Sequence, residues 1–165
     1  MAPGRWCRHL LASIWRTHRR FDRAARAAIE RAVTEVESRH AGEIRVAIET
    51  ALDLPDLYFG VTARQRALAV FGMLGVWDTA ANNGVLIYVL MADREVQIVA
   101  DRGIAARVPK GEWAAICRAI ESDFRAGRYG EGVAAGVHAV GAVLARHFPY
   151  DGGDRNELRD EPVLL

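Results

Sequence analysis

The feature that most constrains the fold is an unbroken apolar run, VLIYVLM, at residues 85–91. A strand buried on both faces is apolar throughout, whereas a strand with one face in water alternates between apolar and polar residues. The run is followed by ADRE and VQIVA, which predict a tight turn and a returning strand over 95–100. We therefore expect a hairpin at the centre of a sheet, with helices on both faces because so few strands cannot enclose a core alone.

The flanking segments have the periodicity of helices and of one further strand. Apolar residues recur at three- and four-residue spacings over 19–40, 112–127 and 131–148, and Thr62 is placed as the N-cap of another helix. The alternating segment EIRVAIETA predicts a strand over 44–51. This order of elements predicts a fold of the α/β class, a three-layer α/β/α sandwich around a small mixed β-sheet of three to four strands.

The polar segments DTAANNG, at 78–84, and DRG, at 101–103, are expected to lie at the same end of this sheet. A right-handed crossover makes the first strand parallel to the apolar run, and the tight turn brings the next strand back antiparallel. One polar segment precedes the central strand and the other follows the returning strand, so the two meet. The side chains expected to gather there are Asp78, Asn82, Asn83, Asp101 and Arg102.

Carboxylate and amide oxygens favour a hard divalent cation, so Asp78, Asn82, Asn83 and Asp101 are candidate ligands of Ca²⁺ or Mg²⁺. Arg102 is the nearest candidate to bind a phosphate group. A structural interpretation stays open, with the first aspartate as a helix cap, the asparagines as a turn and the Asp-Arg pair as a salt-bridged surface loop. The sequence lacks the signatures of an EF-hand, a P-loop, a nucleophile elbow and a zinc-binding helix.

Charge and composition indicate which partners and which cellular compartment to expect. The net charge is +1, so nucleic acid is not an expected partner. No apolar run reaches the roughly 18 residues that span a bilayer. The two cysteines are far apart and neither belongs to a CxxC motif, which is typical of free thiols in a reducing compartment. We therefore expect a cytoplasmic protein.

Two segments are candidates for contacts with larger partners. Leu54, Leu57, Tyr58 and Phe59 lie in a segment broken by proline and glycine, and they either form a surface for a protein partner or fold over the end of the sheet. The arginine-rich N-terminus also carries tryptophan, a combination that suits peripheral contact with a membrane. A loosely packed first helix is the preferred interpretation of that segment.

Several short motifs occur in an order that resembles the TPM domain family, in particular a soluble bacterial branch of it. NNG opens the buried strand, DR turns the hairpin, a glycine follows the returning strand, and a tryptophan-bearing helix leads into FRAGRYGEGVAAGV and HFP. The residues that carry the resemblance are Asn83, Gly84, Asp93, Arg94, Gly103, Phe124, Arg125, Gly127, Tyr129, Gly132 and Gly136. The resemblance implies a TPM-like domain over 19–149, between a basic segment at 1–18 and an acidic tail at 150–165.

The resemblance also carries an expectation about function. In that family a plant thylakoid member is associated with acid phosphatase activity, and some bacterial members bind divalent metal ions, calcium among them. This implies a divalent-metal-responsive binding or accessory module. The alternative it implies is a low-activity metal-dependent phosphatase acting on phosphate monoesters, so whether the chain is an enzyme stays open.

Overall fold

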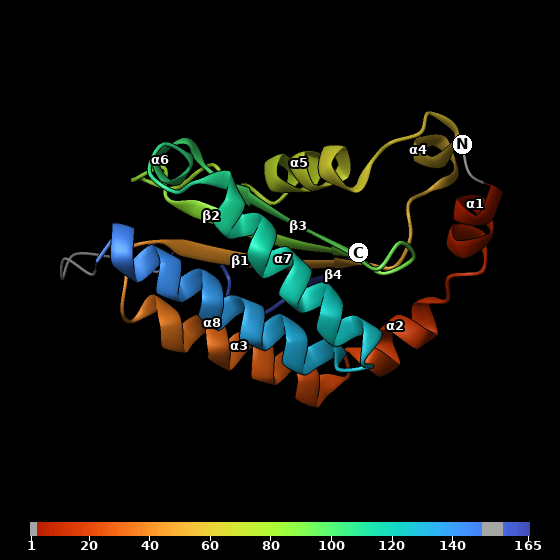
Figure 1. Ribbon diagram of the computed structural model, residues 1–165, viewed down its shortest axis with the longest axis horizontal. Coiled ribbons are helices and arrows are strands. Elements are labelled where there is room, and N and C mark those ends of the chain that lie inside the picture. Colours follow the sequence, from red (N-terminus) through yellow and green to blue (C-terminus); the bar gives the residue numbers. More distant parts are fainter. Residues whose placement is uncertain (1–2, 150–156) are drawn as a thin grey trace.

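The computed structural model describes residues 3–149 and 157–165. Residues 1–2 of the predicted basic segment and 150–156 of the predicted acidic tail lie outside the described residues. The arrangement of the helices and strands is drawn in Figure 1. Their bounds are α1 Pro3–Leu10, α2 Ile14–Arg20, α3 Arg23–Glu37, β1 Glu43–Glu49, α4 Leu54–Tyr58, α5 Ala63–Met73, β2 Gly84–Leu90, β3 Glu95–Ala100, α6 Arg102–Ala105, α7 Lys110–Arg125, α8 Tyr129–His147 and β4 Val163–Leu164.

The sheet has four strands in the order β3-β2-β1-β4. β1 and β2 are parallel, β2 and β3 are antiparallel, and β4 is parallel to β1. Every residue of β2 is buried, which confirms the prediction that the continuous apolar run forms a central strand. The mixed sheet of three to four strands is likewise confirmed.

Helices cover both faces of the sheet, and the two faces are separate hydrophobic clusters. Figure 1 shows α3, α7 and α8 on one side and α5 on the other. Alternation along β1 sends Ile44, Val46 and Ile48 into the cluster under α3, α7 and α8. Leu86 and Tyr88 of β2 face the second cluster, under α5. The predicted three-layer α/β/α sandwich is therefore confirmed.

Glycines bring α8 close to its neighbours. A Cβ atom at Gly132 would lie 2.7 Å from the Cβ of Asp123, and one at Gly136 would lie 2.4 Å from the Cδ1 of Ile120. Both neighbours belong to α7, so only glycine permits this separation of the two helices.

The structure differs from the predicted elements in three places. The helix predicted over 19–40 begins at Arg23 as α3, and residues 19–20 end α2 instead. The break arises because Asp22 caps α3 by accepting a hydrogen bond from the backbone N–H of Ala25 at 2.8 Å. The segment after β1, predicted as a loop broken by proline and glycine, contains the short helix α4. The fourth strand, β4, comes from the predicted tail, and the backbone N–H of Leu165 extends its pairing by donating to the Ile48 carbonyl at 2.9 Å.

Candidate functional site

The two polar loops predicted to meet do lie side by side, at the end of the sheet where α6 sits in Figure 1. The backbone N–H of Asp101 donates to the Gly84 carbonyl at 2.9 Å, and that of Gly103 donates to the Asn82 carbonyl at 3.2 Å. A Cβ atom at Gly103 would lie only 2.6 Å from that carbonyl oxygen, so the contact requires glycine. The strand directions inferred from the sequence are thus those that bring the loops together.

Asn83 and Asp101 are the buried members of this cluster, with 3% and 7% of their surface exposed. Asn83 donates through its side-chain amide to the Ala41 carbonyl. Asp101 caps α6, because its Oδ1 accepts from the backbone N–H of Arg102 at 2.6 Å. The remaining side-chain oxygens, Oδ1 of Asn83 and Oδ2 of Asp101, are buried and have no hydrogen-bond partner among the described residues.

Of the other predicted members of the site, Asp78 and Arg102 are exposed and Asn82 is partly buried. Arg102 reaches back to Asn82, with its Nη2 at 3.4 Å from the amide oxygen. Asp78 makes no side-chain hydrogen bond or ion pair with any residue that the structure describes, so its carboxylate is not held against the cluster. Within residues 3–149 and 157–165, no group of three or more His, Cys, Asp and Glu side chains is arranged to hold a metal ion. Any cation here would therefore depend on amide oxygens as well as on Asp101.

The opposite end of the sheet contains an ion cluster that the sequence analysis missed. The carboxylate of Asp93, in the turn after β2, accepts from Nε of Arg5 and from Nη2 of Arg8, both at 2.9 Å, and lies 3.1 Å from Nε2 of His9. Burial raises the pKa of Asp93, but hydrogen bonds from Arg8, Arg5 and His9 outweigh burial and hold the pKa below its usual value. The hairpin turn thus anchors α1 through the side chains of Arg5, Arg8 and His9.

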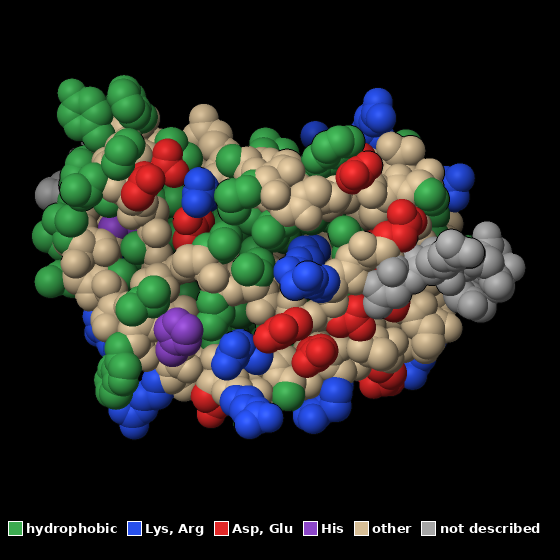
Figure 2. All heavy atoms as spheres, turned by 180° about the vertical axis from the view of Figure 1, so that it is seen from behind, with side chains coloured by type: hydrophobic (Ala, Val, Ile, Leu, Met, Phe, Trp, Pro, Cys, Tyr) green, Lys and Arg blue, Asp and Glu red, His purple; other side chains and the backbone are tan. Residues whose placement is uncertain are grey.

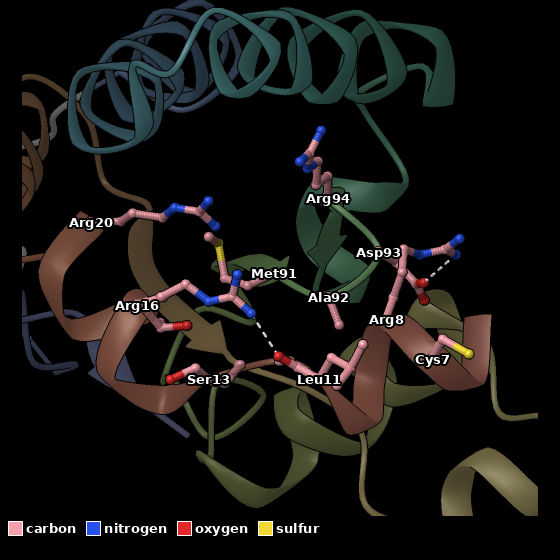
Figure 3. Close-up of a pocket in the computed structure, with 13 residues that line it drawn as sticks. Cys7, Arg8, Leu11, Ser13, Arg16, Arg20, Met91, Ala92, Asp93 and Arg94 are labelled. Carbon is pink, nitrogen blue, oxygen red and sulfur yellow. Dashed lines mark hydrogen bonds and ion pairs between the residues drawn. The ribbon is translucent and has the colours of Figure 1, made fainter. Parts of the chain in front are cut away.

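Beside this anchor lies a cavity of 730 Å³ between the N-terminal helices and the hairpin. Arg8, Arg16, Arg20 and Arg94 line it, together with Asp93. In Figure 3 the arginines of α2 approach the cavity from one side and Arg94 of the hairpin turn from another. An arginine-lined cavity of this size fits an anionic group, because guanidinium groups bind phosphate and carboxylate oxygens in a fork.

An ion pair between Arg66 and the buried carboxylate of Glu49 lies under α5 and belongs to the core. Arg66 holds Glu49 through contacts of 2.7–3.1 Å, and the hydroxyl of Tyr88 donates to the same carboxylate at 2.5 Å. Burial and the hydrogen bond to Glu49 raise the pKa of Tyr88 well above its usual value. The hydrogen bonds that Arg66 itself donates to Glu49 raise the pKa of Arg66. Because these groups are satisfied by one another, we interpret the pair as structural.

The predicted partner surface at α4 is only partly exposed. Leu57 is 2% exposed and packs in the second cluster, so it is not available to a partner. Leu54, Tyr58 and Phe59 are 58–79% exposed. The amphipathic character of this short helix, with Asp53 as its N-cap, accounts for the division. Any partner contact at α4 therefore involves the remaining three side chains.

Comparisons with known proteins agree with the fold. Residues 17–143 match the family model of the TPM domain. The chain is similar to the BA42 protein of the psychrophilic bacterium Bizionia argentinensis, with 30% identity, a TM-score of 0.77 and coverage of 87% of this chain and 94% of that one. It is also similar to the N-terminal domain of a protein from P. gingivalis, with 25% identity, a TM-score of 0.62 and coverage of 77% and 78%. A search of curated proteins found no match.

Proposed function

Because the chain belongs to the TPM domain family, we propose that it is a binding or accessory module that responds to a divalent cation held where loop 78–83 meets Asp101. The observation that supports the proposal is the pair of buried oxygens, Oδ1 of Asn83 and Oδ2 of Asp101, with no partner among the described residues. Buried polar atoms without partners are costly, and a bound cation or water relieves that cost. Oxygen atoms of carboxylate and amide groups suit Ca²⁺ or Mg²⁺.

Two further members of the loop would complete such a site. Asn82 and Asp78 lie in the same loop, and their side chains would add oxygen ligands if binding drew them inward, with water in the remaining positions. The cation would then tie loop 78–83 to the start of α6. We propose that this link between the loop and α6 is the response of the module to the metal. A ligand that binds only the folded state stabilises that state.

Calorimetric titration with Ca²⁺ and Mg²⁺, paired with thermal unfolding, tests the proposal. The wild type should bind and its melting temperature should rise, while Asp101→Asn should weaken binding but keep an oxygen to cap α6. Asp53→Asn is the matched control, because Asp53 is also the N-cap of a short helix, α4, and lies in a different loop. Absence of binding to the wild type, or equal binding by both variants, would refute the site.

A metal-dependent phosphatase is the second candidate function. The observation that favours it is the exposed guanidinium of Arg102 beside Asn82, which would place a positive charge next to the cation. Phosphate-ester hydrolysis uses this combination of a metal and a charge clamp. Turnover of an aryl phosphate should require added metal and should be lost in Arg102→Gln. Activity that survives this change, or that Arg31→Gln on α3 abolishes equally, would count against the phosphatase.

The proposed compartment is reducing, with the cytoplasm as the location we infer. Both Cys7 and Cys117 are free in the structure, as the sequence predicts. Separately, no helix within the described residues combines the length and the apolar character needed to cross a bilayer.

A further inference from the structure

The N-terminal helices carry an unusual amount of exposed apolar surface. Four side chains that are close in sequence are 60–72% exposed: Leu10, Leu11, Ile14 and Trp15. They occupy the end of α1, the turn after it and the start of α2. Figure 2 shows hydrophobic side chains gathered along the end of the molecule that α4, α1 and α2 form in Figure 1. Exposed apolar groups clustered in this way mark a surface that contacts something other than water.

The same segment is locally basic although the whole chain has a net charge of only +1. Arg16 binds the Leu11 carbonyl at 2.6 Å and Arg20 stacks on the Tyr129 ring at 4.4 Å, so neither of these arrangements neutralises a guanidinium. Arg94 has no ion pair with a described residue. The carboxylate on the cavity wall, Asp93, is already held by Arg5 and Arg8. The cavity therefore keeps an excess of positive charge.

The apolar and basic groups are interleaved on one short stretch of chain. Ile14 and Trp15 directly precede Arg16, and the guanidinium of Arg19 lies 5.6 Å from the Trp15 ring centroid. Interfacial segments of peripheral proteins have this character, with aliphatic and tryptophan side chains among the lipid chains and arginines at the level of the phosphates. A cavity that presents several guanidinium groups beside these side chains would take a lipid phosphate.

We propose that this end of the protein docks on an anionic membrane surface, where the side chains of Leu10, Leu11, Ile14 and Trp15 insert and a lipid phosphate occupies the arginine-lined cavity. The surface lies at the opposite end of the sheet from the proposed cation site, so the two proposals are independent. The interleaving of apolar and basic groups favours a membrane over a protein partner, because an anionic bilayer supplies both complementary environments in a fixed order of depth.

Co-sedimentation with vesicles tests the proposal in a buffer that contains a chelator, so that the cation site plays no part. The full chain should bind vesicles of phosphatidylcholine mixed with phosphatidylglycerol and should bind pure phosphatidylcholine far less. Binding should fall with added salt. Arg16→Gln and Arg94→Gln should each weaken it about fivefold, as expected for a basic residue near the surface. Leu11→Ser combined with Ile14→Ser should abolish it.

Matched controls separate docking from general effects. Arg31→Gln removes an exposed arginine of α3, and Leu68→Ser removes a half-exposed leucine of α5, so both should leave binding unchanged. All the replaced side chains lie at the surface, and circular dichroism checks that each variant folds. Asp101→Asn should also bind vesicles normally, which distinguishes failure here from failure of the cation proposal.

Three results would overturn the proposal. One is the absence of binding to vesicles that contain phosphatidylglycerol. Another is equal loss of binding in the control variants. The third is a protein that does not bind vesicles but binds inorganic phosphate, with phosphate binding weakened by Arg94→Gln. The cavity would then bind a free anion, and the apolar side chains would contact a protein partner.

Discussion

Replacing Arg66 with methionine should destabilise the protein, because the buried carboxylate of Glu49 loses its ion-pair partner. The side chain of Glu49 is 7% exposed and receives contacts of 2.7–3.1 Å from the guanidinium. Removing one partner of a buried ion pair costs about 3–5 kcal/mol. Arg66 is 27% exposed, and Tyr88 would still donate to the carboxylate, so we expect about 2–3 kcal/mol. At this chain length that corresponds to a fall in melting temperature of about 5–10 °C.

A surface pair provides a control with the same shortest N···O distance. Arg39 and Glu35 also have an N···O distance of 2.7 Å, but their side chains are 63% and 54% exposed. Exposed pairs of this kind contribute about 0.5 kcal/mol or less. Arg39→Met should therefore change the free energy of unfolding very little. The difference between the two variants measures the effect of burial on pairs with the same shortest N···O distance.

Urea unfolding followed by circular dichroism gives the free energies, provided that the slope with denaturant is unchanged between variants. A third variant, Glu49→Met combined with Arg66→Met, removes both charges and should be more stable than Arg66→Met alone. If Arg66→Met costs no more than Arg39→Met, or if the double variant is the least stable, then the stranded charge is not the cause and the reasoning fails.

Three other perturbations are as specific. Burial lowers the pKa of His40 from 6.5 to about 4, so below pH 6.5 the unfolded state binds a proton that the folded state does not. The free energy of unfolding should therefore fall by about 3 kcal/mol by pH 4, and His40→Gln should reduce this pH dependence in urea titrations. Gly84→Ala should destabilise strongly, because its Cβ would lie 2.0 Å from a backbone oxygen, whereas Gly72→Ala has free space and should stabilise α5 by about 0.5–1 kcal/mol in thermal unfolding; the reverse order would contradict this. Burial raises the pKa of Cys117 to about 11, so iodoacetamide should label only Cys7 rapidly at neutral pH, as mass spectrometry can check.

The hydrophobic periodicity of the sequence predicted the helices and strands that pack their apolar residues in the core. The run at 85–91 becomes β2, and Thr62 caps α5 in a capping box with Gln65. The juxtaposition of Asn83 and Asp101 also followed from the sequence, because the direction of each strand determines the end of the sheet at which its loops lie. What the pattern could not determine was which side chains are buried there and which, like Asp78, extend into water.

Long-range pairings were beyond the sequence pattern. Asp93 binds arginines of α1, and nothing local to ADRE indicates so distant a partner. The arginines of the cavity are visible in the sequence, but an arginine-rich composition hides the few that converge. The break before α3 did have a signal, because Asp22 precedes an alanine-rich helical run and is a favourable N-cap.

The short strand β4 covers an edge of the sheet that would otherwise be open to pairing with another chain. Val163 and Leu164 pair with Ala47 and Ile48, and they cover the outer edge of β1. If this segment detached, β1 would present unpaired backbone groups and apolar side chains, which form a template for a strand from a second molecule. Val163 and Leu164 therefore protect this sheet edge against aggregation, and we expect self-association of the domain to begin with their release from β1.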